Sequence, residues 1–201
     1  MADNLYTKEH DEEQVSLINN VLKSQQDAFD KERFSNAESR IKDLRLLKSA
    51  ILKYQDSLVE ALSIDFGCRS IDDSKIADIM PTIMGINYSI KRIKKWMKPS
   101  KRHVGLMFQP AKAYVAYQPL GVIGIITPWN YPVFLALGPL TTALAAGNRA
   151  MIKMSEFTPE TNKVIGQIIS TAFSEDKVCM FDGGPSVAAH FSKQAFDHLI
   201  F

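Results

Sequence analysis

Asn130 stands in a short turn whose residue types suit the stabilisation of an oxyanion. The turn is the run Pro128-Trp129-Asn130-Tyr131-Pro132, and it comes one residue after the apolar stretch 121–126. Its prolines stiffen the backbone and hold the asparagine amide in place. A fixed amide donor in a dry site lowers the barrier to a developing oxyanion by about 3 kcal/mol. The alternative is an asparagine that caps its own turn.

Lys153 and Glu156 follow the next apolar stretch, with Ser155 between them. At the end of a strand, a lysine can donate to the hydroxyls of a ribose and a carboxylate can accept from them. The alternative is an exposed surface ion pair, which contributes little energy. The sequence contains no Gly-x-Gly-x-x-Gly run, so the usual dinucleotide fingerprint is missing.

The second half of the chain predicts the scaffold that would position these residues. Residues 103–201 hold only six basic and six acidic side chains, and short apolar runs alternate there with helical patterns. Thr158 and Pro159 are typical of a helix start, and Gly147 of a helix end. The expected strands are 121–126, 150–152, 178–181 and 199–201, and the expected helices are 133–146, 159–173 and 186–191. This alternation predicts an open parallel sheet that binds ligands at the carboxyl ends of its strands.

The first half, residues 1–102, holds 18 basic and 16 acidic side chains and reads as amphipathic helices. Apolar residues recur at helical spacing over 9–30, 35–67 and 76–97, with a capping box at Ser35 and Glu38. Pro81 should mark either a first turn or a kink. Between the halves, 113–117 alternates like a strand, and we expect it to pair with 105–108. The fold class is therefore α/β, with N-terminal helices before part of an open, mostly parallel, Rossmann-like sheet.

Composition and charge exclude several classes of protein. The net charge is +2, no run is long and apolar enough to span a membrane, and the acidic N-terminus is no secretory signal, so we expect a cytoplasmic protein. Cys68 and Cys179 are far apart, with no His cluster, so no disulfide framework or metal site is indicated. The basic run 91–102 around Trp96 could bind nucleic acid or an anionic membrane, but a solvated helix end is the simpler interpretation.

The segment 119–161 resembles the aldehyde dehydrogenase superfamily. It reads PLGVIGIITPWNYPVFLALGPLTTALAAGNRAMIKMSEFTPET, with the Pro-Trp-Asn turn, the Ala-Ala-Gly-Asn helix end and the Lys-x-x-Glu pair in the family's order, and a weaker resemblance covers about 16–201. The Ser155-Glu156 pair, GGPSVAAHF at 183–191 and DHLIF at 197–201 are most similar to the branch with coniferyl aldehyde dehydrogenases and class 3 fatty or aromatic aldehyde dehydrogenases.

This resemblance implies roles for the candidate residues. Asn130 would supply the oxyanion-hole amide, and Lys153 with Glu156 would hold the adenosine ribose of NAD or NADP. The other implied cofactor-binding residues are Ile126, Thr127, Pro128, Trp129, Ser155, Gly184 and Pro185, the last two near the adenine. Because Glu156 would accept from a free 2′-hydroxyl and repel a 2′-phosphate, we expect NAD, with NADP as the alternative.

The resemblance also implies that parts of the enzyme lie beyond Phe201. In the family, the nucleophilic cysteine and the carboxylate base come much later, and neither Cys68 nor Cys179 stands in their context, so both are interpreted as structural. We expect an amino-terminal portion with a helical segment 1–102, a ribbon 103–118 that serves as the arm of a homodimer, and the first part of the sheet, 119–201. Alone it should be inactive and, with an uncovered sheet edge, poorly soluble.

The implied reaction is oxidation of an aldehyde, aromatic such as coniferaldehyde or fatty, to the carboxylic acid through a cysteine thiohemiacetal and thioester. One alternative is an acyl-phosphate reductase of the same superfamily. The other is a non-catalytic binding module that uses the basic run 91–102.

Overall fold

Four parallel strands form the central sheet of this chain. The computed structural model describes residues 6–201, and its sheet has the strand order β5-β4-β3-β6. Each strand is short, and β3 and β4 are almost wholly buried, as expected of a sheet covered on both faces. The predicted open α/β sheet is confirmed. The strands are β3 (Val122–Ile126), β4 (Arg149–Lys153), β5 (Val178–Phe181) and β6 (His198–Ile200).

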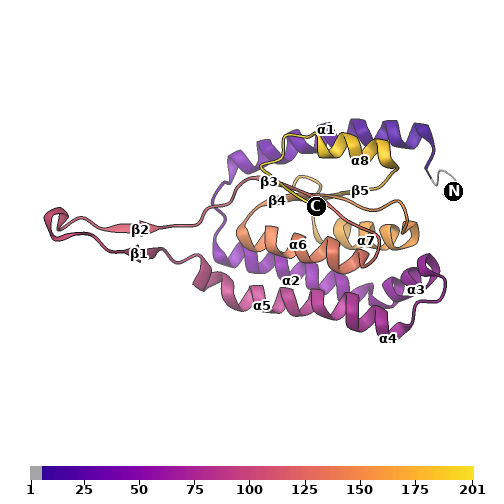
Figure 1. The fold of residues 1–201 in the computed structure, drawn as a ribbon, viewed down its shortest axis with the longest axis horizontal. Coiled ribbons are helices and arrows are strands. Elements are labelled where there is room, and N and C mark those ends of the chain that lie inside the picture. Colours follow the sequence, from indigo (N-terminus) through magenta and orange to yellow (C-terminus); the bar gives the residue numbers. More distant parts are fainter. Residues whose placement is uncertain (1–5) are drawn as a thin grey trace.

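Helices cover both faces of the sheet (Figure 1). On one face lie α1 (Lys8–Lys31) and α8 (Pro185–Ser192), which share a small apolar core with one side of the strands. On the other face lie α6 (Pro132–Ala146) and α7 (Pro159–Ala172), which belong to the larger core. The stripe of buried residues along α1, from Ile18 to Leu22, confirms the helix expected over 9–30.

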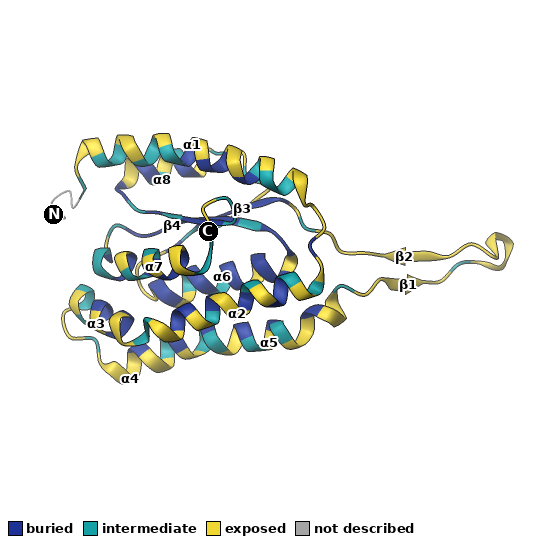
Figure 2. Cartoon of the chain, turned by 180° about the vertical axis from the view of Figure 1, so that it is seen from behind, coloured by how far each residue is buried: buried dark blue, intermediate teal, exposed yellow. Residues whose placement is uncertain are grey.

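A further layer of helices packs outside α6 and α7. It contains α2 (Ala37–Lys53), α3 (Gln55–Phe66) and α5 (Met80–Trp96), whose buried faces alternate with exposed ones in Figure 2. Arg40 of α2 is buried and donates to the carbonyls of Ala145 and Ala146 at the end of α6. The charged half of the chain therefore encloses the sheet half on this face.

Three details of the helical half differ from the sequence expectation. The helix expected over 35–67 is two helices that meet at Tyr54, because α3 turns to pack on α7 while α2 packs on α5, α6 and α7. The N-cap is Asn36, which accepts from the Ser39 amide at 2.8 Å, whereas Ser35 instead accepts from Arg40. Before α5, a turn α4 (Ile71–Asp73) runs into a π-helical turn η1 (Ser74–Ile79).

Pro81 explains the π-helical turn. It lies in the first turn of α5 and has no N–H to donate to the preceding turn. The Met80 amide donates five residues back, to Lys75, so one extra residue is accommodated there. Both expected readings of Pro81 thus hold in part: it is in a first turn, and the helix before it is distorted.

The expected ribbon is present, but its strands differ from the prediction. β2 (Ala113–Val115) pairs antiparallel with β1 (Ser100–Arg102), and 106–108 forms a 3-10 turn near the tip instead of a strand. Leu106, Met107 and Phe108 need a turn conformation there because they connect the two strands. The ribbon projects far from the body and is exposed along its length (Figures 1 and 2). The basic run begins on the solvated last turns of α5, where Lys94 pairs with Glu38 at 2.9 Å.

Carboxylates from the first half of the chain cap the helices of the second half. α6, α7 and α8 each begin with a proline and have no side-chain cap of their own. Asp78 accepts from the Phe134 amide at the start of α6, Asp65 from the Glu160 and Thr161 amides of α7, and Asp11 from the Gly184 amide of α8. Thr158 is the N-cap residue of α7 as expected, with Pro159 after it, but its hydroxyl donates to Asn162 and makes no capping hydrogen bond.

Candidate functional site at the carboxyl edge of the sheet

The carboxyl ends of three strands lie in one row. Ile126 of β3 is in register with Lys153 of β4, and Lys153 with Phe181 of β5. The Thr127 amide donates to the Lys153 carbonyl, and the Met154 amide to the Phe181 carbonyl, each at 2.9 Å. The loops that follow these strands therefore leave the same edge of the sheet. The candidate residues named from the sequence are the last residues of β3 and β4, residues of these loops, or the first residue of α8.

The Asn130 turn is exposed at this edge. Pro128, Trp129 and Asn130 are all exposed, and among residues 6–201 no hydrogen bond is made by the Asn130 side chain. The interpretation of Asn130 as a residue that caps its own turn is therefore wrong. Its amide opens beside a cavity of about 410 Å³ lined by Phe66, Gly67, Cys68, Arg69, Asp73, Asn130 and Tyr131. An amide with free donors at the edge of a cavity can bind a negatively charged oxygen.

Lys153 is buried, so the surface ion-pair alternative is wrong. Its side chain is 1% exposed, and its ammonium donates to the carbonyls of Met154 at 2.7 Å and Gly183 at 2.8 Å. Burial lowers the pKa of Lys153, and the nearby carboxylates of Glu156, Asp182 and Asp11 oppose that shift. An ammonium has three protons, and the two carbonyls account for two of them.

Ser155 and Asn162 shape the loop that carries Glu156. Ser155 is buried, with its carbonyl accepting from the Asn162 side chain at 2.7 Å and its hydroxyl accepting from the Phe157 amide at 3.3 Å. Glu156 is half-buried, and its charge acts on Lys153. The sequence did not point to Asn162, because a polar residue within a predicted amphipathic helix is typical of its solvent-exposed face.

The N-terminal end of α1 lies over the neighbouring β5–α8 loop. Asp11 accepts from the Gly184 amide at 3.0 Å and from the Ser186 hydroxyl, and His10 contacts Asp182 at 2.9 Å. Tyr6 stacks on His10, and burial together with the Asp182 carboxylate raises the pKa of Tyr6 to about 12. No sequence signal could have found these residues, since they lie more than 170 positions from their partners.

Gly184 and Pro185 form the start of α8, where Gly184 is buried and Pro185 exposed. On the other side of Lys153, Thr127 has a buried hydroxyl that makes no hydrogen bond within the described chain. A buried hydroxyl without a partner costs free energy unless a ligand or water satisfies it. This hydroxyl and the third proton of Lys153 fit the hydroxyl-rich ribose of a dinucleotide.

The two cysteines differ in their surroundings. Cys179 is buried in β5, and burial raises its pKa to about 12, which keeps the thiol protonated and agrees with a structural role. Cys68 is exposed, has a positive φ of 87°, and lines the cavity beside Asn130. Cys68 follows the end of the helix at Gly67 and its thiol is not buried, so its interpretation as a structural residue stays a prediction.

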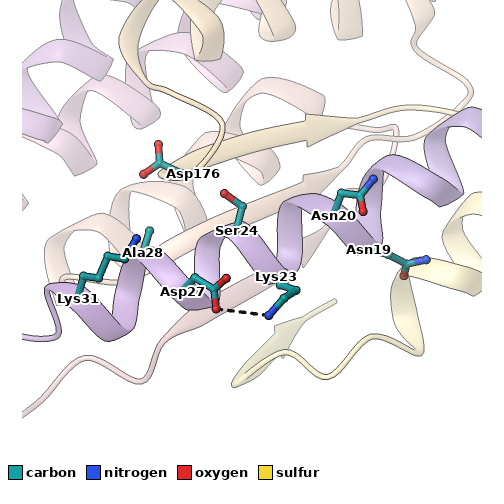
Figure 3. A pocket seen from close by; sticks show the side chains of 8 residues that line it. All are labelled: Asn19, Asn20, Lys23, Ser24, Asp27, Ala28, Lys31 and Asp176. Carbon is teal, nitrogen blue, oxygen red and sulfur yellow. Dashed lines mark ion pairs between the residues drawn. The ribbon is translucent and has the colours of Figure 1, made fainter.

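A second depression lies at the opposite edge of the sheet. It has a volume of about 760 Å³ and runs along α1 next to Asp176, which precedes β5 (Figure 3). Apart from Ala28, the side chains that line it are polar, and Lys23 pairs with Asp27 at 3.6 Å. Ligands of open α/β sheets bind at the carboxyl ends of strands, so this depression is not the candidate site.

A parallel α/β sheet with its polar loops gathered at the carboxyl edge is the architecture of nucleotide-binding α/β proteins. Comparison with known proteins identifies the family within this class of proteins. The chain belongs to the aldehyde dehydrogenase family, whose sequence profile matches residues 4–201. This confirms the resemblance seen in the sequence.

Individual relatives support the same branch. The chain is 47% identical, over all of its 201 residues and 42% of the relative, to a probable coniferyl aldehyde dehydrogenase of Pseudomonas aeruginosa. It is 31% identical to aldehyde dehydrogenase family 3 member B1 of Bos taurus, over 90% of this chain and 38% of that one. A solved structure, the substrate-bound state of Staphylococcus aureus AldH, superimposes with a TM-score of 0.88 at 30% identity, over 92% of this chain and 40% of that one.

The chain thus spans about two fifths of the length of these relatives. Within residues 6–201, none of the helices has the length and apolar character needed to cross a membrane.

Proposed function

We propose that this chain is the cofactor-binding part of an NAD-dependent aldehyde dehydrogenase and supplies one donor of its oxyanion hole. One observation supports the proposal: Ile126 and Lys153, the last residues of β3 and β4, are paired in register, so the loop with Asn130 and the loop with Glu156 leave the same edge of the sheet. A cofactor held by its ribose at β4 would extend along this edge toward the turn after β3, where the aldehyde would react. The test is NADH formation from an aldehyde by the protein of the complete reading frame.

Each residue of the site would have a defined task. Lys153 would donate its third proton to a ribose hydroxyl, and Glu156 would accept from the ribose on the other side. Thr127 would use its unpaired hydroxyl toward the cofactor, while Ile126, Pro128 and Trp129 would form the wall of the cleft. Ser155 would fix the Glu156 loop, and Gly184 and Pro185 would lie near the adenine. When bound, NAD supplies the hydride acceptor.

Asn130 would act on the reacting carbonyl. In the proposed reaction a cysteine thiolate from outside this chain adds to the aldehyde carbon, and the carbonyl oxygen becomes an oxyanion. The Asn130 amide donates to that oxygen, which stabilises the thiohemiacetal. NAD, when bound, would accept the hydride of the thiohemiacetal carbon, which would leave a thioester. One water would then hydrolyse the thioester, with its hydroxyl going to the acyl carbon and its proton to the cysteine sulfur, to give the carboxylic acid and the free thiol.

The names of the relatives support a substrate class. We propose an aromatic aldehyde such as coniferaldehyde, because similar proteins are named coniferyl aldehyde dehydrogenases, with a fatty aldehyde as the alternative that the sequence resemblance implies. The aromatic side chains at the cavity beside Asn130, those of Phe66 and Tyr131, would suit either kind.

Glu156→Gln should weaken the preference for NAD over NADP. The carboxylate repels the 2′-phosphate of NADP, and the neutral amide removes this repulsion while keeping the size of the side chain. A gain of about tenfold in the NADP/NAD ratio of kcat/KM corresponds to about 1.4 kcal/mol of relieved repulsion. Glu160→Gln is the control, since the Glu160 side chain is 39% exposed and pairs with Lys163 within α7. An unchanged ratio in E156Q would mean that Glu156 does not set the preference.

The ribbon is proposed to be the arm of a homodimer. Leu106, Met107 and Phe108 near its tip are 89%, 95% and 70% exposed, and apolar side chains so far from a core are typical of a surface covered by another chain. L106K/F108K should convert a dimer into a monomer, measured by light scattering. The control K101Q changes the charge of the ribbon without changing its apolar tip, and should remain dimeric. A dimeric double variant would show that the tip does not hold the subunits together.

A further inference from the structure

The Asn130 turn is held from outside by Arg69. This side chain comes from the loop between α3 and α4 and is 8% exposed. Its Nη1 is 3.5 Å from the Asn130 carbonyl, and its guanidinium lies 4.9 Å from the centre of the Tyr131 ring and 5.1 Å from that of Phe66. An arginine between two aromatic rings is fixed in position by cation–π attraction on both sides.

Asp78 connects this arginine to the helix that follows the turn. Its carboxylate is fully buried, and Oδ1 accepts from the Phe134 amide at 2.6 Å in the first turn of α6. Oδ2 lies 3.5 Å from Nη1 of Arg69, whose Nε donates to Asp73 at 2.6 Å. Because Tyr131 offers α6 no side-chain cap, Asp78 supplies the carboxylate that the helix N-terminus favours.

The π-helical turn places Asp78 where both contacts can form. Asp78 lies in η1, in which the ladder of hydrogen bonds is widened by one residue before Pro81. The widened turn changes the direction of the side chains relative to a regular helix. Such turns cost stability and occur frequently at functional sites.

We propose that Arg69 and Asp78 are positioning residues that hold the Asn130 amide in place for the oxyanion. Arg69 holds the turn through the carbonyl of Asn130, and Asp78 holds it through the first turn of α6. The inference rests on the proposed function, because the position of this amide matters only when an oxyanion forms beside it. A displacement of about 1 Å at a reacting centre lowers a rate by about 10²-fold.

The first test compares arginine variants in the protein produced from the complete reading frame. Arg69→Met should lower kcat about 10- to 100-fold, with the KM for NAD nearly unchanged, because the cofactor's ribose is held at β4. Arg69→Lys keeps the positive charge and should recover part of the loss. The matched control is Arg149→Met: Arg149 has an 11% exposed side chain, donates to the Ala28 carbonyl and contacts Asp176, but lies at the amino end of β4.

The second test uses pH. The charged groups that face Asp78 are Arg69 and Asp73, and α6 contributes the amides of Val133 and Phe134. Burial raises the pKa of Asp78 to about 6, against the opposing effects of the Phe134 amide and Arg69. As the pH falls through this value, the carboxylate becomes neutral and loses its attraction for Arg69, so kcat should fall. Asp78→Asn is neutral at every pH, and its kcat should be low without this acidic limb.

Hydrogen exchange measured by mass spectrometry reports the turn directly. Peptides that cover 128–138 should exchange faster in R69M and D78N than in the wild type, and R149M should leave them unchanged. If the wild type oxidises aldehydes and R69M keeps the wild-type kcat, the inference is overturned but the proposed function is not. An equal loss of kcat in R69M and R149M would have the same meaning. A wild type with no aldehyde oxidation would overturn the proposed function, and with it the catalytic purpose of the pair.

Discussion

Asn130→Ala is expected to lower kcat for aldehyde oxidation about 10²- to 10³-fold, the usual loss when one oxyanion donor is removed. The expected loss is large because the amide is exposed at the cavity beside the turn and is not committed to any hydrogen bond within the described residues. The alanine variant should fold, since it gives up no internal side-chain contact. The KM for NAD should change little, because the ribose site is at β4.

The measurement is steady-state NADH formation with saturating aldehyde and NAD. Asn148→Ala serves as the control for a lost asparagine, since its side chain accepts from the Leu120 and Gly121 amides at the amino edge of the sheet. N148A should lower stability more than N130A and kcat much less. If N130A kept most of its kcat, the oxyanion role of Asn130 would be refuted even in an active enzyme.

Lys153→Met is expected to raise the Kd for NAD about 10- to 100-fold, because hydrogen bonds from a charged donor are each worth about 1.5–3 kcal/mol. The variant also leaves the Met154 and Gly183 carbonyls without their donor, so the melting temperature should fall. Binding is measured by titration calorimetry at a temperature well below the melting transition of both proteins.

Lys163→Met is the matched control, because this lysine is 65% exposed and, among the described residues, its ion pair is with Glu160 of the same helix, α7. The wild type should also lose affinity as the pH rises, because burial lowers the pKa of Lys153 and the neutral amine appears earlier than in an exposed lysine. K153M should lack this decline. An equal Kd for NAD in K153M and K163M would refute the role of Lys153 in holding the ribose.

Local patterns in the sequence predicted the strands and helices of the sheet unit well. The run 121–126 is short, β-branched and apolar, and such a run has few alternatives to a buried strand. Gly147 marked the end of α6 and Pro159 the start of α7 for reasons of backbone geometry, while α6 begins one residue earlier than expected, at Pro132. The strand ends then had to lie together, which is why the edge of the sheet could be named as the candidate site.

Contacts between distant segments could not be predicted in the same way. Asp11, Asp65 and Asp78 look like ordinary charged residues of amphipathic helices, yet each caps a helix that begins later in the chain. The burial of Lys153 depends on the Gly183 carbonyl, and periodicity cannot report on a partner 30 residues away. The same limit applies to Arg69, whose contacts with Tyr131 and Asn130 exist only after α3 has packed on α7 and η1 has packed on α6.

Two expectations differ from the structure in detail: the N-cap of α2 and the strand that pairs with β2. Asn36 and Ser35 are both good N-caps, and Arg40 decides between them by binding Ser35. β2 pairs with 100–102 instead of 105–108, which leaves 103–112 for the tip; the alternation in 113–117 indicates a strand but does not specify which segment pairs with it.

The most direct test of the proposed function measures NADH formation by the protein of the complete reading frame. Coniferaldehyde, a long-chain aldehyde and a small aldehyde are compared, each with NAD and with NADP, and the 201-residue chain is the control. We predict turnover by the complete protein with NAD, fastest with the aromatic or the long-chain aldehyde, and none by the 201-residue chain. Absence of NADH and NADPH with all three aldehydes would contradict the proposal and favour the acyl-phosphate reductase or the binding module.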